Sequence, residues 1–432
     1  MEPHTSIGIV GGGIAGMACA RLLHRRHEIR LYEAQAYVGG HTNTVLVEED
    51  GVPVPIDTGF MVYNDVTYPN LVQLFAELNV ATMNTSMSFS VQHIPSGLEY
   101  SGTSVNHLFA QRRNLLNPAF IRMLLQIRRF NAEAPEVLGE SRYASYTLEE
   151  YVREKGYGRD MLMKYLVPMS SAVWSAPPGR VLDFPVVTLV RFFKNHGFLG
   201  LHTQHQWKTV VGGARMYRDA LIAPFRASIR TGNPAVKIVR DAEGVEIVFA
   251  DGSRARHDCV ILACHADEAL GLLEQPAPAE RRLLAAFAYQ PNRATLHTDG
   301  TVMPHTPLAW SSWNYRLDVD RAGEHVASTV YYMNSLQKVS RKRDYFVSIN
   351  DPGLVDPASV LAVIDYRHPL FSLEGMRAQR ELPALNRTGP VYFCGSYFRY
   401  GFHEDALTSA IELCRSLEGA TRRDTVPEAA GG

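Results

Sequence analysis

The stretch that decides the fold is Gly-Ile-Val-Gly-Gly-Gly-Ile-Ala-Gly at residues 8–16. The short apolar run 6–10 predicts a buried parallel strand, and apolar residues at helical spacing in 14–23 predict a helix directly after the glycines. A glycine-rich turn between a strand and a helix is the arrangement by which dinucleotide-binding domains hold phosphates. The chain is therefore predicted to begin with a nucleotide-binding βαβ unit.

Three glycines in this stretch have separate expected roles, because they stand at the G-x-G-x-x-G spacing. Gly11 permits the tight turn, Gly13 lets the backbone approach a pyrophosphate, and Gly16 lets the helix pack closely on the strand. The free N–H groups at the helix N-terminus, around Ile14 and Ala15, then face the phosphates.

An acidic residue supports this interpretation at the expected distance. Glu33 closes the second predicted strand, 28–32, and lies 17 positions after Gly16 (33 − 16 = 17). Near this offset a carboxylate accepts the hydroxyls of an adenosine ribose, and it would repel a 2′-phosphate, which argues against NADP. Ala34 is expected beside the same nucleoside. The alternative is an ordinary βαβ turn followed by a surface glutamate.

Further segments resemble the flavoprotein superfamily of amine oxidases and phytoene desaturases: Gly39-Gly40-His41-Thr42, Asp57-Thr58-Gly59-Phe60, Val391 to Ser396, and Gly401 to Ala406. This resemblance implies FAD rather than NAD, with the second glycine pair along the diphosphate and the C-terminal helix facing the flavin pyrimidine. It implies further cofactor contacts at Gly39, Gly40, His41, Thr42, Thr58, Gly59, Phe60, Val236, Gly395, Ser396, Asp405, Ala406 and Leu407.

The resemblance is closer to a bacterial group of predicted NAD/FAD-binding oxidoreductases. The motifs that carry this resemblance are Tyr68-Pro69-Asn70, Phe109-Ala110-Gln111-Arg112-Arg113-Asn114, Ser312-Trp313-Asn314-Tyr315 and Gly401-Phe402-His403-Glu404-Asp405. Members of the group are commonly encoded beside cyclopropane-fatty-acid synthases, and in plants fused to them. A methyltransferase of that kind is therefore an expected partner, and an apolar lipid an expected substrate.

The expected fold class is α/β, with a discontinuous Rossmann-like FAD-binding domain and an α+β substrate domain, as in amine oxidases. At 432 residues the chain is long enough for two such domains. Helical patterns are predicted to dominate 68–174, with helices over 70–78, 119–130 and 148–154, and another helix is predicted over 407–417. A β-meander is predicted over 235–239, 244–249 and 259–263. The predicted segments are 1–66, 205–267 and 386–420 for FAD, 67–204 and 268–385 for substrate, and a disordered tail at 421–432.

Composition excludes several classes of function. The 43 basic and 44 acidic residues nearly balance, so the composition shows no excess of positive charge for binding nucleic acid. The five cysteines are scattered without metal-site spacing. No metal is therefore predicted, and reduced buried thiols are expected. There is neither an 18-residue apolar run nor a signal-peptide pattern, which predicts a cytoplasmic protein. The arginine-rich helix 119–130 suggests peripheral contact with the inner membrane surface, although solvated arginines on a core helix are the plainer interpretation.

The catalytic candidates are His403, Glu404 and Tyr332. His403 suits general acid or base work because an ordinary imidazole titrates near neutral pH, whereas Glu404 and Asp405 could simply stabilise a helix N-terminus. Aromatic residues are expected to line an apolar substrate pocket, although many aromatics belong to the core: Trp313, Tyr315, Tyr397, Tyr400 and Phe402.

Two departures from the amine-oxidase pattern concern reactivity. Where many of those enzymes carry a lysine that reaches flavin N5 through water, this chain has Asn292 or Arg293, which puts rapid oxidation by dioxygen in doubt. Ser396 stands where an acidic residue usually follows the strand. No second strand-GxGxxG-helix unit is present, so the electron acceptor stays open.

The sequence leaves three functions open. The leading hypothesis is desaturation, oxidation or double-bond rearrangement of an unsaturated or methyl-branched fatty-acyl lipid, by hydride transfer with flavin N5. The second is an amine oxidase, which needs a polar amine site. The third is a flavin-binding partner of a lipid methyltransferase that has no turnover of its own.

Overall fold

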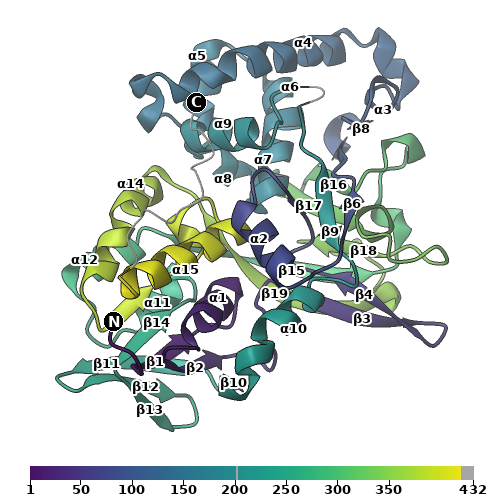
Figure 1. Cartoon of the computed structure of the whole chain (residues 1–432). Coiled ribbons are helices and arrows are strands. Elements are labelled where there is room, and N and C mark those ends of the chain that lie inside the picture. Colours follow the sequence, from purple (N-terminus) through teal and green to yellow (C-terminus); the bar gives the residue numbers. More distant parts are fainter. Residues whose placement is uncertain (201–202, 420–432) are drawn as a thin grey trace.

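The computed structural model describes residues 1–200 and 203–419, so the predicted tail 421–432 lies outside the described residues. One of its two large sheets is parallel, has five strands and combines segments from both ends of the chain (Figure 1). The strand order is β10-β2-β1-β14-β20. The bounds are Ser6–Val10 for β1, Glu28–Glu33 for β2, Ile229–Thr231 for β10, Cys259–Leu262 for β14 and Val391–Phe393 for β20.

Alternation along these strands supplies a core to each face of the sheet. Ile7 and Ile9 point to the face covered by α1 (Ile14–Leu23) and α15 (His403–Leu417), whereas Val260 and Leu262 point to the opposite face. That second face packs against α11, α12 and a small antiparallel sheet. The remaining bounds on this side of the molecule are α10 Arg215–Ile222, α11 Ala266–Leu272, α12 Pro278–Leu284, α14 Leu373–Glu381, β11 Ala235–Asp241, β12 Gly244–Phe249 and β13 Arg254–His257.

The predicted β-meander needs a correction. Its third strand is β13, whereas the predicted strand 259–263 is β14, which pairs in parallel with β1 in the main sheet. The polar composition of β13, Arg-Ala-Arg-His, hides its strand character, because apolar alternation is the signal by which a strand is recognised.

The second large sheet is mixed and has seven strands, in the order β19-β15-β18-β17-β16-β7-β8. The prediction that helices dominate 68–174 is wrong for its first part, since β6, β7 and β8 lie there. The bounds are β6 Thr82–Thr85, β7 Phe89–His93, β8 Leu98–Ser101, β15 Ala288–His297, β16 Trp313–Val319, β17 His325–Tyr332, β18 Phe346–Ile349 and β19 Val360–Leu370.

Helices form one end of the molecule, at the top of Figure 1. The predicted helices 119–130 and 148–154 are confirmed as α4 and α5, and Thr147 and Glu150 form the expected capping box on α5. Together these helices enclose an aromatic-rich core. Their bounds are α3 Val105–Leu108, α4 Pro118–Glu133, α5 Leu148–Lys155, α6 Arg159–Met161, α7 Val167–Trp174, α8 Pro178–Leu182 and α9 Val186–Asn195.

Short elements join the two sheets. Leu71 and Phe75 of α2 pack into the core around α1, so α2 is attached to the parallel sheet although the predicted boundary placed it in the other domain. The bounds are α2 Pro69–Glu77, α13 Met333–Leu336, β3 Thr44–Glu49, β4 Val52–Asp57, β5 Tyr63–Asn64 and β9 Trp207–Val210.

Candidate functional site

A cavity of about 650 Å³ opens at the carboxyl ends of the parallel strands. Strand β1 lies between β2 and β14. The connection after β1 leads to β2 on one side, whereas the connection after β14 leads to β20 on the other side, and a crevice forms at such a switch point. Residues within two positions of the ends of four neighbouring strands line the cavity: Gly11, Ala34, Ala263 and Gly395. The sheet topology therefore brings together segments that are far apart in the sequence.

The glycine loop has the geometry that its sequence predicts. Gly11 has a φ of 106°, which favours glycine, and a Cβ added at Gly16 would lie 1.9 Å from the carbonyl oxygen of Gly11. A Cβ added at Gly13 would meet nothing within 4 Å, because Gly13 faces the cavity. Ile14 and Ala15 also line the cavity, whereas Gly16 lies behind it as a packing residue.

The carboxylate of Glu33 lies against the glycine loop. Its Oε2 accepts a hydrogen bond of 2.7 Å from the Gly12 amide, and its Oε1 accepts one of 2.8 Å from the Gln35 amide. Burial raises the pKa of Glu33, and the side chain still lines the cavity together with Ala34. Each oxygen retains a lone pair, so the predicted contact with two ribose hydroxyls fits this geometry.

The second glycine pair lies on the opposite side of the loop. Gly39, Gly40 and His41 line the cavity, as do Gly59 and Phe60. Thr42 and Thr58 do not reach it. Their hydroxyls lie 2.5 Å from the Tyr217 hydroxyl and 2.9 Å from the Tyr366 hydroxyl, so both threonines support the wall from behind.

The C-terminal segment places a second helix N-terminus at the cavity. Gly395, Ser396, His403 and Ala406 line it. The side chain of Leu407 is buried in the core between α15 and the sheet, so the predicted contact of this residue with the cofactor could come only from its backbone N–H and stays a prediction. Because backbone N–H groups at a helix start lack intrahelical partners, the first turn of α15 can stabilise negative charge in the cavity.

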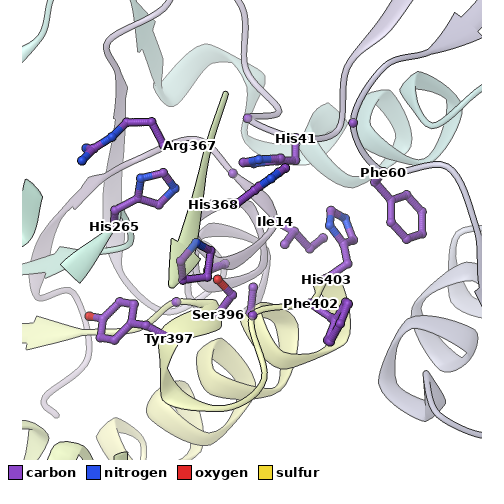
Figure 2. Close-up of a pocket in the computed structure, with 18 of the residues that line it drawn as sticks. Ile14, His41, Phe60, His265, Arg367, His368, Ser396, Tyr397, Phe402 and His403 are labelled. Carbon is purple, nitrogen blue, oxygen red and sulfur yellow. The ribbon is translucent and has the colours of Figure 1, made fainter. Parts of the chain in front are cut away.

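His403 is held between an aromatic ring and a tyrosine hydroxyl. Its ring stacks on Phe60 at 4.1 Å between centroids (Figure 2). Its Nε2 lies 2.5 Å from the hydroxyl of Tyr217. Burial lowers the pKa of His403 to about 3, so the ring is neutral near pH 7. The cavity therefore contains a neutral, hydrogen-bonding imidazole, and the role of His403 as a general acid or base stays a prediction.

Glu404 points away from the cavity, although it follows His403 in the chain. Its carboxylate accepts hydrogen bonds from the amides of Asn70 and Leu71, at 2.9 and 3.0 Å, at the start of α2. A helix advances by 100° per residue, so neighbouring residues in α15 face different surroundings. The catalytic assignment of Glu404 is wrong, since it caps α2.

Asp405 is also a capping residue rather than a lining residue. Its Oδ2 accepts a hydrogen bond of 2.9 Å from the Phe402 amide, which forms a capping box at the start of α15. Burial raises its pKa from 3.8 to about 7. The folded protein therefore binds a proton at Asp405 more tightly than the unfolded chain does.

This shift predicts a pH-dependent stability. The contribution of Asp405 is fully present below about pH 4 and is lost as the pH rises through about 7, because ionisation is disfavoured in the folded state. A shift of three units corresponds to about 4 kcal/mol. We expect Asp405→Asn to gain thermal stability relative to the native protein between pH 4 and 8. Parallel melting temperatures across this range would contradict the assignment.

Three more histidine and arginine side chains, which the sequence did not single out, come to the cavity from the loop after β14 and from strand β19: His265, His368 and Arg367. Figure 2 shows His41 and His368 side by side, with ring centroids 5.1 Å apart. Burial lowers the pKa of His41 and lowers that of His368 to about 4. The Nε2 atom of His41 is buried without a hydrogen-bond partner in the described structure, so it is left for a ligand.

Aromatic and aliphatic side chains line the cavity next to His403. Phe402 stacks on Phe192 at 5.0 Å and lies 6.1 Å from Trp174, and Trp313 and Tyr397 line the cavity as predicted. Tyr331 also lines the cavity. Other lining residues come from the helical region and the domain junction and were missed: Met61, Val62, Met87, Val173, Trp174, Phe192, Phe198 and Trp207.

Four predicted site residues lie elsewhere. Tyr315 follows Trp313 by two positions on β16 and is buried against Ala172 of α7. Tyr332 donates to Asp344 outside the cavity, so its catalytic assignment is wrong. Tyr400 does not line the cavity, and its carbonyl accepts from the indole of Trp174. The side chain of Val236 is 49% exposed, and its neighbour Ala235 lines the cavity instead.

The structure shows where Asn292, Arg293 and the five cysteines lie. Asn292 is buried with its amide group 2.8 Å from Nδ1 of His368, whereas Arg293 pairs with Asp365 at the surface. No lysine is among the described residues that line the cavity. The five cysteines are free, and Cys264, which lines the cavity, is the one that is not fully buried.

Comparison with known proteins identifies the family. The sequence profile of the flavin containing amine oxidoreductases matches residues 14–333. The chain belongs to this family. It is an FAD-dependent oxidoreductase with the two-domain amine oxidase fold. Among curated protein sequences, none matches this chain.

Solved structures with the same fold act on different compounds. The chain is similar to cyclohexylamine oxidase from Brevibacterium oxydans IH-35A (17% identity, TM-score 0.66, covering 96% of this chain and 100% of that chain). It is similar to a putative protoporphyrinogen oxidase from Exiguobacterium sp. 255-15 (16%, 0.64, 98% and 100%). It is also similar to the CLA-producing fatty acid isomerase from P. acnes (12%, 0.66, 95% and 98%).

The residues present fit FAD. Glu33 would hold the adenosine ribose, the open space at Gly13 and the N-terminus of α1 would hold the diphosphate, and the N-terminus of α15 would lie at the flavin. The unpartnered Nε2 of His41 requires a polar partner in the same cavity.

Proposed function

We propose that this oxidoreductase acts on an unsaturated or methyl-branched fatty-acyl lipid, by desaturation, oxidation or double-bond rearrangement. The observation that carries the proposal is the apolar wall around Phe192, Trp174 and Phe402 beside His403. A wall of this kind excludes water and holds a hydrocarbon chain through burial of its surface. Bound FAD supplies the hydride acceptor for such chemistry.

The charges in the cavity favour this substrate over an amine. Among the described lining residues the carboxylates are Glu33 and Glu268, and Glu33 is bonded to the glycine loop while Glu268 belongs to α11. Neither comes from the aromatic wall. An ammonium group buried there would lack a counter-charge, and burying an unpaired charge is strongly unfavourable. The flavin-dependent amine oxidase is therefore the weaker candidate.

The chain's own residues give the reaction two features. The aromatic wall positions the acyl chain, and neutral His403 offers a hydrogen bond from a ring that Tyr217 and Phe60 hold in place. The pKa values of His41, His368 and His403 are all lowered by burial, so these rings add no positive charge to the cavity at neutral pH. Three neutral rings suit the uncharged hydrocarbon chain of an acyl lipid.

Ligand binding should separate the two substrate classes. We expect unsaturated fatty acids and unsaturated phospholipids to perturb the absorption spectrum of the bound flavin, because they enter the apolar end of the cavity. Primary amines of equal chain length should leave the spectrum unchanged. Saturable binding of an amine with no effect of any lipid would overturn the proposal.

The link to a cyclopropane-fatty-acid synthase-like methyltransferase is a second part of the proposal. It is supported by the sequence resemblance and by the apolar cavity, since the product of such an enzyme is a modified acyl lipid. If the chain were a flavin-binding partner without turnover, it would bind the methyltransferase. No lipid would then reduce the flavin, and no lipid would be converted to a product. Co-purification combined with product analysis distinguishes these outcomes.

A further inference from the structure

One stretch of the helical region has a strongly unbalanced charge. Residues 102–130 contain five arginines and no aspartate or glutamate, although acidic and basic residues are nearly equal in the whole chain. All five arginines are exposed. Arg112 and Arg113 donate to neutral oxygens of Asn106, Phe109 and Gly97, so their charges are not compensated by these contacts.

The same stretch exposes large apolar side chains. Leu116 is 91% exposed, Val105 74%, Leu125 59% and Leu115 54%. These values are among the highest for large apolar residues in the described structure, and Leu116 has the highest. Single exposed apolar residues are common, but four within 21 positions beside uncompensated arginines are a feature of an interaction surface.

The helix α4 has two distinct faces. Phe120, Met123 and Phe130 are buried in the helical core, whereas Arg122, Leu125 and Arg129 lie on the opposite, exposed face at three- and four-residue spacing. Of these arginines, Arg129 pairs with Glu133. The exposed leucine is therefore not part of the core-forming stripe and lies between cationic side chains.

A polar hollow opens beside this face. It has a volume of about 320 Å³ and is lined by Arg113, Lys164, Asn114 and Asn117, with Leu116 at its side and Asp160 paired to Lys164. Arg113 supplies an uncompensated cation there. A hollow with this chemistry fits the phosphate of a lipid headgroup, while the neighbouring leucine fits the acyl region.

We propose that Val105, Leu115, Leu116 and Leu125, together with Arg112, Arg113, Arg122 and Arg128, form a docking surface for a bilayer that contains anionic phospholipids. Apolar side chains inserted at the level of the headgroups and arginines at the phosphates are the two contributions to interfacial binding. A second copy of this surface would bring uncompensated arginines against each other, which disfavours a dimer through this face. No described helix is long and apolar enough to cross a bilayer, so the contact is peripheral.

The surface belongs to the same rigid helical core that lines the cavity. Phe120 and Met123 of α4 pack in one cluster with Trp174, Phe192 and the start of α15 at Phe402. Figure 1 shows α3 and α4 at the end of the molecule opposite β13. Docking through this end would leave the nucleotide-binding sheet facing away from the membrane.

Vesicle sedimentation tests the surface with the FAD-loaded protein. We expect binding to vesicles of phosphatidylglycerol and phosphatidylcholine in equal parts, and weaker binding to pure phosphatidylcholine and at high salt. Leu115→Asp with Leu116→Asp should lower the partition coefficient by about tenfold or more, because two inserted side chains become charged. Arg112→Gln with Arg113→Gln should lower it by about tenfold on anionic vesicles.

Matched controls separate this surface from general effects. Leu46 is 49% exposed on β3, which Figure 1 shows away from α3 and α4, and Arg226 is exposed near β10, so Leu46→Asp and Arg226→Gln should leave vesicle binding unchanged. Flavin content and melting temperature show that each variant is folded. Equal binding of the leucine variant, or equal binding to both kinds of vesicle, would overturn the proposal.

Other occupants of the surface give different results. Self-association that disappears in the leucine variant, with no vesicle binding, would assign the surface to a second copy and overturn the proposal. Binding of an acidic protein in the absence of lipid, lost in the leucine variant and without vesicle binding, would likewise overturn the proposal. Vesicle binding needs no turnover. The docking proposal can therefore fail while the proposed lipid chemistry is confirmed, and the lipid chemistry can fail while docking is confirmed.

Discussion

Replacing Gly13 by aspartate is expected to give a folded protein that contains no FAD. Gly13 is the N-cap of α1 with extended backbone angles, and a Cβ there meets nothing within 4 Å, so the fold can accept a side chain. Aspartate is a favoured N-cap residue. Its carboxylate would, however, enter the space for the diphosphate, where repulsion of about 3 kcal/mol weakens binding about 100-fold.

The controls for this variant use other glycines. Gly179 lies in the first turn of α8 and also has open space around its Cβ, so Gly179→Asp should keep its FAD. Gly16→Ala should instead destabilise the fold, because its Cβ would lie 1.9 Å from the Gly11 carbonyl oxygen. Absorbance of the flavin in the purified proteins, together with circular dichroism, distinguishes these outcomes. Normal FAD content in Gly13→Asp would contradict the cofactor assignment.

Replacing His403 by alanine is expected to leave FAD content intact and to slow substrate-dependent flavin reduction about 10- to 100-fold. The physical reason is the loss of one positioned hydrogen bond to a group whose charge changes during the reaction. Because burial lowers the pKa of His403 to about 3, the ring should add no break to the pH–rate profile between pH 5 and 9. Stopped-flow absorbance, normalised to bound FAD, measures both effects.

Tyr217 provides the matched variant for this prediction. Its hydroxyl lies 2.5 Å from both Nε2 of His403 and Oγ1 of Thr42, and the residue does not line the cavity. Tyr217→Phe should therefore produce a smaller decrease in the same rate by releasing the orientation of the imidazole. If the normalised rate of His403→Ala equals that of the native protein, His403 has only a structural role.

The predictions made from the sequence are accurate where short-range chemistry determines position. The spacing of Gly11, Gly13 and Gly16 and the offset to Glu33 place a strand, a turn and a helix in known order, and all four residues lie as expected at the switch point. The same is true of the capping box at Thr147. These features depend on backbone geometry that the residue types themselves require.

Side-chain direction could not be predicted in the same way. His403 and Glu404 are adjacent in the sequence, yet one faces the cavity and the other caps α2, because α2 packs against one side of α15. Trp313 and Tyr315 share a face of β16, yet Trp313 lines the cavity whereas Tyr315 is buried against Ala172 of α7. In both cases a distant element decides which residue reaches the ligand.

The cavity wall illustrates the same limit at larger scale. Trp174 and Phe192 lie in predicted helical sequence, but nothing local indicates that α7 and α9 turn these rings toward Phe402. His368 lies on β19, whose pairing with β15 brings it beside His41. The strand β7, Phe-Ser-Val-Gln-His, is only five residues long and has two apolar residues, which is too short an alternation to identify a strand.

The central claim, that the cavity performs flavin chemistry on an acyl lipid, is tested most directly by anaerobic mixing of the holoenzyme with unsaturated fatty-acyl lipids and, separately, with primary amines. Flavin absorbance and the mass and double-bond position of the recovered lipid are measured together. The account predicts that a lipid is altered, either with loss of two hydrogens and bleaching of the flavin or with a shifted double bond, while amines leave the flavin oxidised. Bleaching by amines with no change in any lipid would contradict it.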